Sequence, residues 1–195
     1  MDWIDQTLEV IRISTSSQAG WQEIMQIVET TYPSAHWRQL PSVNMDQDIA
    51  DTQTWLVAQL TSSSIPQAIG IYLGLDTLNM DGPDGYNLEL GTSQACNVDL
   101  LDSDWLGNCS WYGEPHLIRG LQQLKAGYDQ PQWRPYVNQA DYIIPLGYSG
   151  LILTAALAQM SLSYPTLIIW GFHDGDLFFL GRHTTTTFEK ICKVI

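Results

Sequence analysis

The residues whose types and spacing suit chemistry begin with the run H-D-G-D at positions 173–176. An imidazole beside two carboxylates has the composition of a metal-ligand set or of an acid/base pair. The same run is also a turn signal, because Asp174-Gly175 suits the central positions of a type I′ turn, which both need a positive φ. We therefore predict that His173 and Asp176 flank a two-residue hairpin turn and that His173 binds no metal.

Ser149 stands in the run G-Y-S-G at positions 147–150, which has the shape of a nucleophile elbow. A strand over residues 142–146 and an apolar helix after it would complete that arrangement. However, the fifth position is Leu151, where the strained turn needs a glycine. A serine ahead of a helix is more commonly its N-cap. We predict that Ser149 caps a helix over residues 150–160.

Two further patterns lack the spacing of a metal site. Residues 77–88 have some positions of a calcium loop, but Thr77 and Leu88 stand at its two anchoring positions. The chain has three cysteines, Cys96, Cys109 and Cys192. None of them has the C-x₂₋₄-C spacing of a zinc site, so we expect reduced, partly buried thiols. We expect no cofactor, because the chain also lacks a glycine-rich phosphate loop and an H-E-x-x-H run.

Aromatic and acidic side chains gather between residues 99 and 114. Seven of them are candidates for binding a partner: Asp99, Asp102, Asp104, Trp105, Trp111, Tyr112 and Glu114. Trp and Tyr supply large, rigid contact areas and are common at interface hot spots. In the alternative interpretation, Trp105 and Trp111 fill the core beneath a loop and the carboxylates solvate that loop.

The charge of the chain is strongly asymmetric. Its 195 residues include 21 Asp and Glu against 8 Lys and Arg, which gives a net charge of −13. Residues 1–118 hold 16 of the acidic residues and only 2 basic ones, whereas residues 119–195 hold 5 acidic and 6 basic residues. Binding to a phosphate backbone needs many Lys and Arg, so the composition excludes a nucleic-acid partner. An acidic surface attracts basic proteins and repels acidic ones.

These observations favour a non-enzymatic interaction protein that recognises a basic protein partner. Immunity proteins that neutralise basic toxins have a similar charge and size, and the analogy goes no further. A second hypothesis is a binding protein or hydrolase for a sugar-like ligand. In that case the aromatic side chains would stack on the ligand, while Asp102, Asp104 and Glu114 would bind hydroxyl groups or act as acid and base. A third is that the acidity serves solubility.

Periodicity predicts a single α+β domain over residues 1–195, with amphipathic helices on a mostly antiparallel sheet. We expect helices over residues 2–13, 18–32, 46–60 (capped by Asp46), 114–126 and 150–160. Strands are expected over residues 67–76, 86–90, 95–101, 166–172 and 176–182, and residues 188–195 form a helix or a strand. The stretch 142–172 has no charged residue, but we interpret it as a buried helix and strand rather than a membrane span. The acidic first turns predict no secretory signal and hence a cytoplasmic protein.

Overall fold

The computed structural model describes residues 2–61, 69–76, 86–97, 101, 103–109, 111–128, 134–173 and 175–195. The chain begins with the helices α1 (Trp3–Ile13), α2 (Ser17–Thr31), η1 (Ala35–Gln39) and α3 (Met45–Leu60). There follow β1 (Gly70–Asp76), β2 (Asn87–Ser93), η2 (Asp104–Asn108), β3 (Trp111–Tyr112) and β4 (His116–Leu117). The last elements are α4 (Arg119–Tyr128), α5 (Arg134–Ala158), β5 (Thr166–Phe172), β6 (Leu177–His183) and β7 (Phe188–Val194).

The described strands form one mixed sheet in the order β3-β2-β1-β5-β6-β7, with β4 also paired to β2. Only β1 and β5 are parallel; the other neighbours are antiparallel. Parallel neighbours need a long crossover, and the chain makes it through α4 and α5. The predicted α+β class and the predicted pairing of the first two strands are both confirmed.

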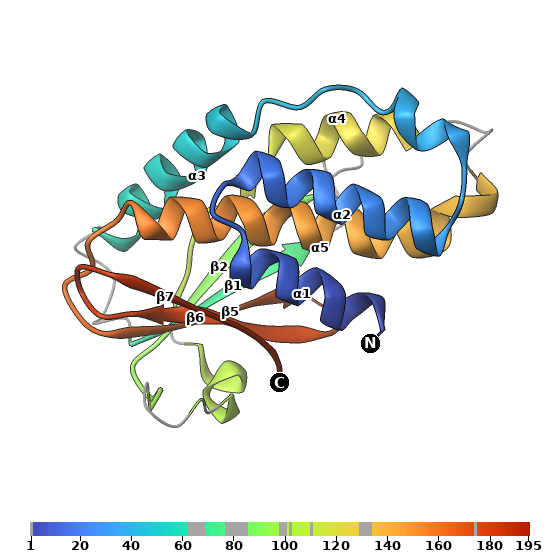
Figure 1. Cartoon of the computed structure of the whole chain (residues 1–195). Coiled ribbons are helices and arrows are strands. Elements are labelled where there is room, and N and C mark those ends of the chain that lie inside the picture. The colour runs from blue at the N-terminus through green and yellow to red at the C-terminus, as the bar shows by residue number, and fades with distance from the viewer. Residues whose placement is uncertain are drawn as a thin grey trace.

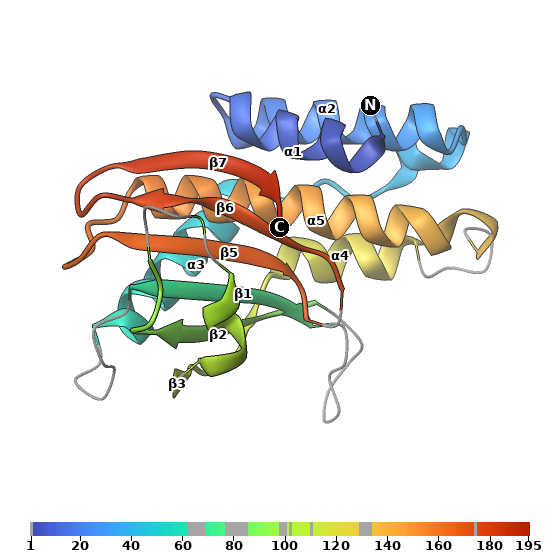
Figure 2. The ribbon, with the colours of Figure 1, turned by 90° about the horizontal axis from the view of Figure 1, so that it is seen from below.

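The described α-helices lie on one face of the sheet, and α5, at the centre of this helical layer, runs along the direction of β5, β6 and β7 (Figure 1). Helices α1 and α2 lie side by side on the outside, near β7 (Figure 2). Alternation along β5 follows this layering. Ile168 and Trp170 belong to the large core under the helices, whereas Leu167 and Ile169 face the opposite side of the sheet. A smaller core lies on that side of the sheet. We call it the open face, because the described α-helices lie on the other side.

Helix α5 is longer than the sequence predicted and overturns the interpretation of Ser149. The helix runs without interruption from Arg134 to Ala158 and contains Pro145, so Ser149 is a mid-helix residue rather than an N-cap. The predicted strand over residues 142–146 is wrong for the same reason. A Cβ on Gly150 would lie 2.6 Å from Ile11, so this glycine lets α1 approach α5 closely.

The apolar part of α5 serves the core. Ala140–Ala158 is long and apolar enough to cross a membrane by length and composition, and 83% of its most apolar window is buried within the protein. Core helices of this kind pass the same test.

The hairpin of β5 and β6 is confirmed, but its turn differs from the prediction. The last pair of the ladder is Gly171 with Leu177. Instead of pairing with Asp176, His173 donates its backbone N–H to Leu75 of β1 at 3.0 Å. Gly171 has the positive φ, +154°, and a Cβ there would meet the Asp176 carbonyl oxygen at 2.2 Å. The turn is therefore longer than a type I′ turn, and Asp174 lies outside the described residues.

Other boundaries also differ from the expectations. The helix predicted from residue 114 begins at Arg119, because residues 116 and 117 pair with β2 as β4. Asn44, rather than Asp46, caps α3 by accepting the Gln47 N–H at 3.2 Å. Residues 95–97 and 101 form no strand; residues 98–100 and the part 77–85 of the calcium-like segment 77–88 lie outside the described residues. The undecided C-terminal segment is the strand β7.

Candidate interaction surface

Strand alternation directs Glu89 toward the open face. Leu88 and Leu90 are fully buried under the helices, so Glu89 between them points to the opposite side. On the neighbouring strand, Tyr112 pairs with Gly91 and is 63% exposed. Glu89 is two residues from Gly91, so Tyr112 and Glu89 are diagonal neighbours on one face, within reach of a long aromatic side chain.

A histidine completes this part of the surface from a distant segment. The His173 Nδ1 lies 3.0 Å from the Glu89 Oε2, with both side chains part-exposed. The two are joined across the sheet because Gly74 of β1 pairs with Glu89 on one side and with Gly171 on the other. The Glu89 carboxylate and the His173 imidazole thus form a part-exposed polar pair on this surface.

Cys109 lies beneath Tyr112 at the same edge. A Cβ built on Gly91 would lie 3.0 Å from the Cys109 Sγ and 3.4 Å from the Tyr112 ring. Burial raises the pKa of the Cys109 thiol, which keeps it neutral and unreactive. The pKa of the Tyr112 phenol is raised by desolvation and by the nearby Cys109 and Glu89. The Tyr112 phenol is therefore neutral at neutral pH.

Trp105 has the role that the alternative interpretation gave it. It is 3% exposed in η2 and packs with Tyr72 and Cys96 in the small core of the open face. Its ring is also 3.0 Å from where a Cβ on Gly70 would stand. Trp105 is thus a core residue, and among the described aromatic side chains of residues 99–114 the exposed one is Tyr112.

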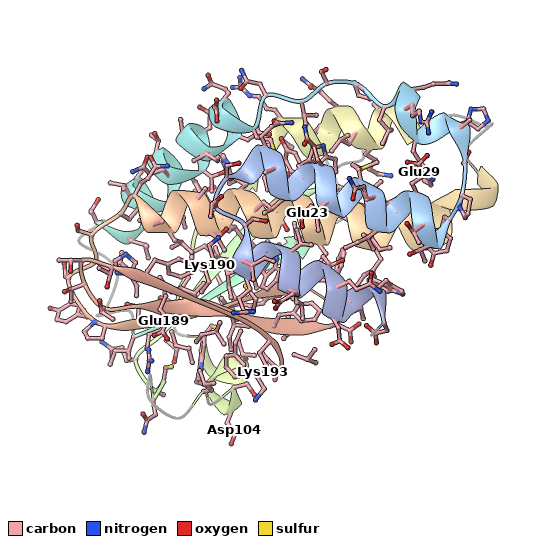
Figure 3. All side chains as sticks on the ribbon, viewed as in Figure 1. Glu23, Glu29, Asp104, Glu189, Lys190 and Lys193 are labelled. Atoms are coloured by element: carbon pink, nitrogen blue, oxygen red, sulfur yellow. The ribbon has the colours of Figure 1, made fainter. Side chains whose placement is uncertain are left out.

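The neighbouring acidic residues are only partly brought together. Asp104 is exposed on η2 and points away from the protein on the side of the sheet opposite Glu23 and Glu29 (Figure 3). Asp99, Asp102 and the side chain of Trp111 lie outside the described part of the chain. The structure therefore describes the side chains of only four of the seven predicted residues: Asp104, Trp105, Tyr112 and Glu114.

Glu114 lies beyond the end of β3 and is held by α3. Its carbonyl oxygen accepts the Trp55 indole N–H at 2.8 Å, and its side chain is exposed. The next strand is held by the same helix: the His116 ring stacks on Trp55 at 5.0 Å, and its Nε2 lies 3.0 Å from the Thr52 hydroxyl oxygen. Burial lowers the pKa of His116. Contacts with α3 therefore hold the chain at Glu114 and His116, which follow Tyr112.

The acidic residues of 1–118 do not all contribute to the surface. Asp48 is 4% exposed and accepts hydrogen bonds from the Tyr148 hydroxyl at 2.7 Å and the Gly120 N–H at 2.9 Å. Glu9 is paired with Arg12 at 2.6 Å on α1, and Glu29 with Arg38 at 3.1 Å. The described carboxylates are therefore spread over the helical layer and the open face rather than gathered in one patch.

The sequence analysis did not single out Glu89, and it placed His173 beside a turn without its contact to Glu89. The outward position of Glu89 follows from alternation in the predicted strand, so the signal was present. The position of His173 depends on β5 lying beside β1, which no local pattern specifies. Comparison with known protein families, curated proteins and solved structures finds no match for this chain.

Proposed function

We propose that this chain is a non-enzymatic protein that binds a basic protein partner through the surface formed by Tyr112, Glu89, Glu114 and Asp104. The observation that carries the proposal is Tyr112, a large aromatic side chain that is 63% exposed beside a carboxylate. Such a side chain supplies contact area, and the carboxylates attract Lys and Arg at a distance. The resemblance in charge and size to immunity proteins is consistent with this role.

The geometry gives less support to the sugar-binding or hydrolase hypothesis. An aromatic residue that stacks on a ligand must be accessible, and Trp105 is buried. A general acid needs a raised pKa, whereas Glu9, one of two carboxylates that line a groove between α1 and α2, has its pKa lowered by Arg12. Within the proposal we place the protein in the cytoplasm, where its described free thiols stay reduced.

The test begins with a partner. Proteins retained by the immobilised chain at low salt and released at high salt are identified, and the binding of each purified protein is measured kinetically. Tyr112→Ala should speed dissociation about 30-fold, the effect of losing an anchor worth about 2 kcal/mol. Glu89→Gln and Asp104→Asn should slow association and flatten its salt dependence.

Tyr164→Ala is the matched control, because Tyr164 is 44% exposed and precedes β5, which β2 and β1 separate from β3 in the sheet. It should leave both rate constants unchanged. Binding that is equally strong in all four variants, or a melting temperature raised by a sugar and by no protein, would overturn the proposal.

A further inference from the structure

A groove with a volume of about 780 Å³ lies between α1 and α2. Its lining follows helical spacing on both sides: positions 6, 9, 10 and 13 of α1, and positions 19, 22, 23, 26, 27 and 30 of α2. Each set is one stripe of a helix surface. The groove therefore runs along the two helices, and the α2 stripe spans about 16 Å at 1.5 Å per residue.

The floor of this groove is apolar and its rim is acidic or amide-bearing. Val10 and Ile27 form part of the floor, and Ile13 at one end is 53% exposed. Glu9 and Glu23 stand on opposite helices, and no Lys or Arg is among the described lining residues. Three glutamine carboxamides, at positions 6, 22 and 26, add hydrogen-bonding groups.

The two helices that form the groove carry a net negative charge, and Lys190 of β7 lies against the end of α1, where it donates to the Ile11 and Ser14 carbonyl oxygens. Residues 2–31 contain five acidic side chains and one basic side chain, Arg12, which is paired with Glu9. Glu23 is exposed and forms no ion pair with any described residue. Arg12 and Glu9 together contribute no net charge, so the charge offered to an occupant comes mainly from Glu23 and from the first turn of α1.

We propose that the α1–α2 groove binds a basic amphipathic helix of a partner protein, about 11 residues long. A third helix fits the groove between two packed helices, with its apolar stripe on the floor. Lys and Arg beside that stripe would meet Glu23 and the acidic residues of α1. The proposal takes the sign of the partner's charge from the proposed function, but it uses a separate surface on the other side of the sheet from Asp104.

The probe is a 14-residue helical peptide with leucines on one stripe and lysines on both sides of it. The control peptide has the same leucines with glutamates in place of the lysines. Binding is measured by fluorescence anisotropy, and the binding site is mapped by amide chemical shifts. The lysine peptide should bind with shifts confined to α1 and α2 and with an affinity that falls as salt rises, while the glutamate peptide should not bind.

Ala19→Phe fills the groove without changing charge and should weaken binding at least tenfold. Ala50→Phe is its matched control, because Ala50 is also exposed on a helix, α3, outside the groove. Glu23→Gln should weaken binding about threefold at low salt, whereas Glu114→Gln, in the proposed surface around Tyr112, should have no effect. Thermal melting of each variant verifies that it is folded.

Three results would overturn the proposal: no binding of the lysine peptide, equal binding by Ala19→Phe, or loss of a self-associated form in Ala19→Phe without any peptide binding. The last would make the occupant a second copy of this chain. Failure here is distinguishable from failure of the proposed function. If a basic partner binds in a way that depends on Tyr112 but the peptide does not bind, only the groove proposal is wrong. If the peptide binds in the groove but no partner depends on Tyr112, only the proposed surface around Tyr112 is wrong.

Discussion

The Tyr148 hydroxyl group lies 2.7 Å from the Asp48 Oδ2 and donates a hydrogen bond to it inside the helical layer. This contact joins α3 to the middle of α5, and the Gly120 N–H, in the first turn of α4, binds the same oxygen. One carboxylate thus connects three helices. Because a buried carboxylate is stable only when its hydrogen bonds are satisfied, the contact should govern how strongly these helices hold together.

Tyr148→Phe should lower the free energy of unfolding by about 1–3 kcal/mol, since it removes a donor from a buried acceptor and keeps the ring. Urea unfolding at neutral pH measures this loss. Tyr164→Phe removes an exposed hydroxyl group and should change the free energy of unfolding by less than about 0.5 kcal/mol. Equal stability of the two variants would mean that the Asp48 contact is not formed.

The same contact predicts an alkaline loss of stability. Burial, together with Asp48, raises the pKa of Tyr148 above its usual value of 10.0. Above about pH 10 the unfolded chain therefore releases a proton that the folded chain keeps, so the free energy of unfolding falls as pH rises. The contribution of Tyr148 is fully present below pH 10. Unfolding measured between pH 9 and 11 should show a shallower decline in Tyr148→Phe than in the original chain.

The hairpin of β5 and β6 should depend on Gly171 more than on Gly175. Gly171→Ala places a Cβ 2.2 Å from a backbone oxygen at a φ of +154°, so we expect a loss of about 3 kcal/mol or more. At Gly175 the nearest atom is the Phe172 Cβ at 3.1 Å, which leaves a tight but adjustable contact. Gly175→Ala should therefore cost much less. The reverse order in thermal or urea unfolding would contradict this turn geometry.

Local sequence patterns were sufficient to predict most elements but not the path of α5. The helices of the first 60 residues and the hairpin strands follow from side-chain periodicity and turn residues. Pro145 and the nearby glycines indicated a break, yet the helix continues through them because burial against α1, α2 and β5 outweighs local propensity. Tertiary packing, which no short window of sequence contains, decided this element.

The candidate site was predictable only in part. Trp105 and Tyr112 both have acidic residues nearby in the sequence, so their local surroundings do not distinguish them. Trp105 is buried because η2 packs on the open face of the sheet, whereas Tyr112 in β3 is exposed. His173 reaches Glu89 only because two distant strands are parallel neighbours. In each case a contact between distant segments determines which side chain a partner can reach.

Ser149 should be structural because of its bond to Trp170. Its hydroxyl oxygen accepts the Trp170 indole N–H at 3.3 Å, and both side chains are fully buried. Ser149→Ala leaves that N–H without its partner and should cost about 1–3 kcal/mol. A double-mutant cycle with Trp170→Phe should give a coupling energy near 1 kcal/mol. Serine-directed covalent probes should not label the protein, and stoichiometric labelling at Ser149 would instead indicate a nucleophile.

Trp105→Ala and Tyr112→Ala should differ in their effect on the free energy of unfolding, which can be measured without a partner. Trp105 is 3% exposed in the small core, so Trp105→Ala should lower the free energy of unfolding by about 3–5 kcal/mol through the cavity it leaves. Tyr112 is 63% exposed, so Tyr112→Ala should change it by less than about 1 kcal/mol. Urea unfolding of both variants gives the comparison. A large loss in Tyr112→Ala would mean that this side chain supports the fold, and its proposed role as the partner-binding aromatic residue would then be wrong.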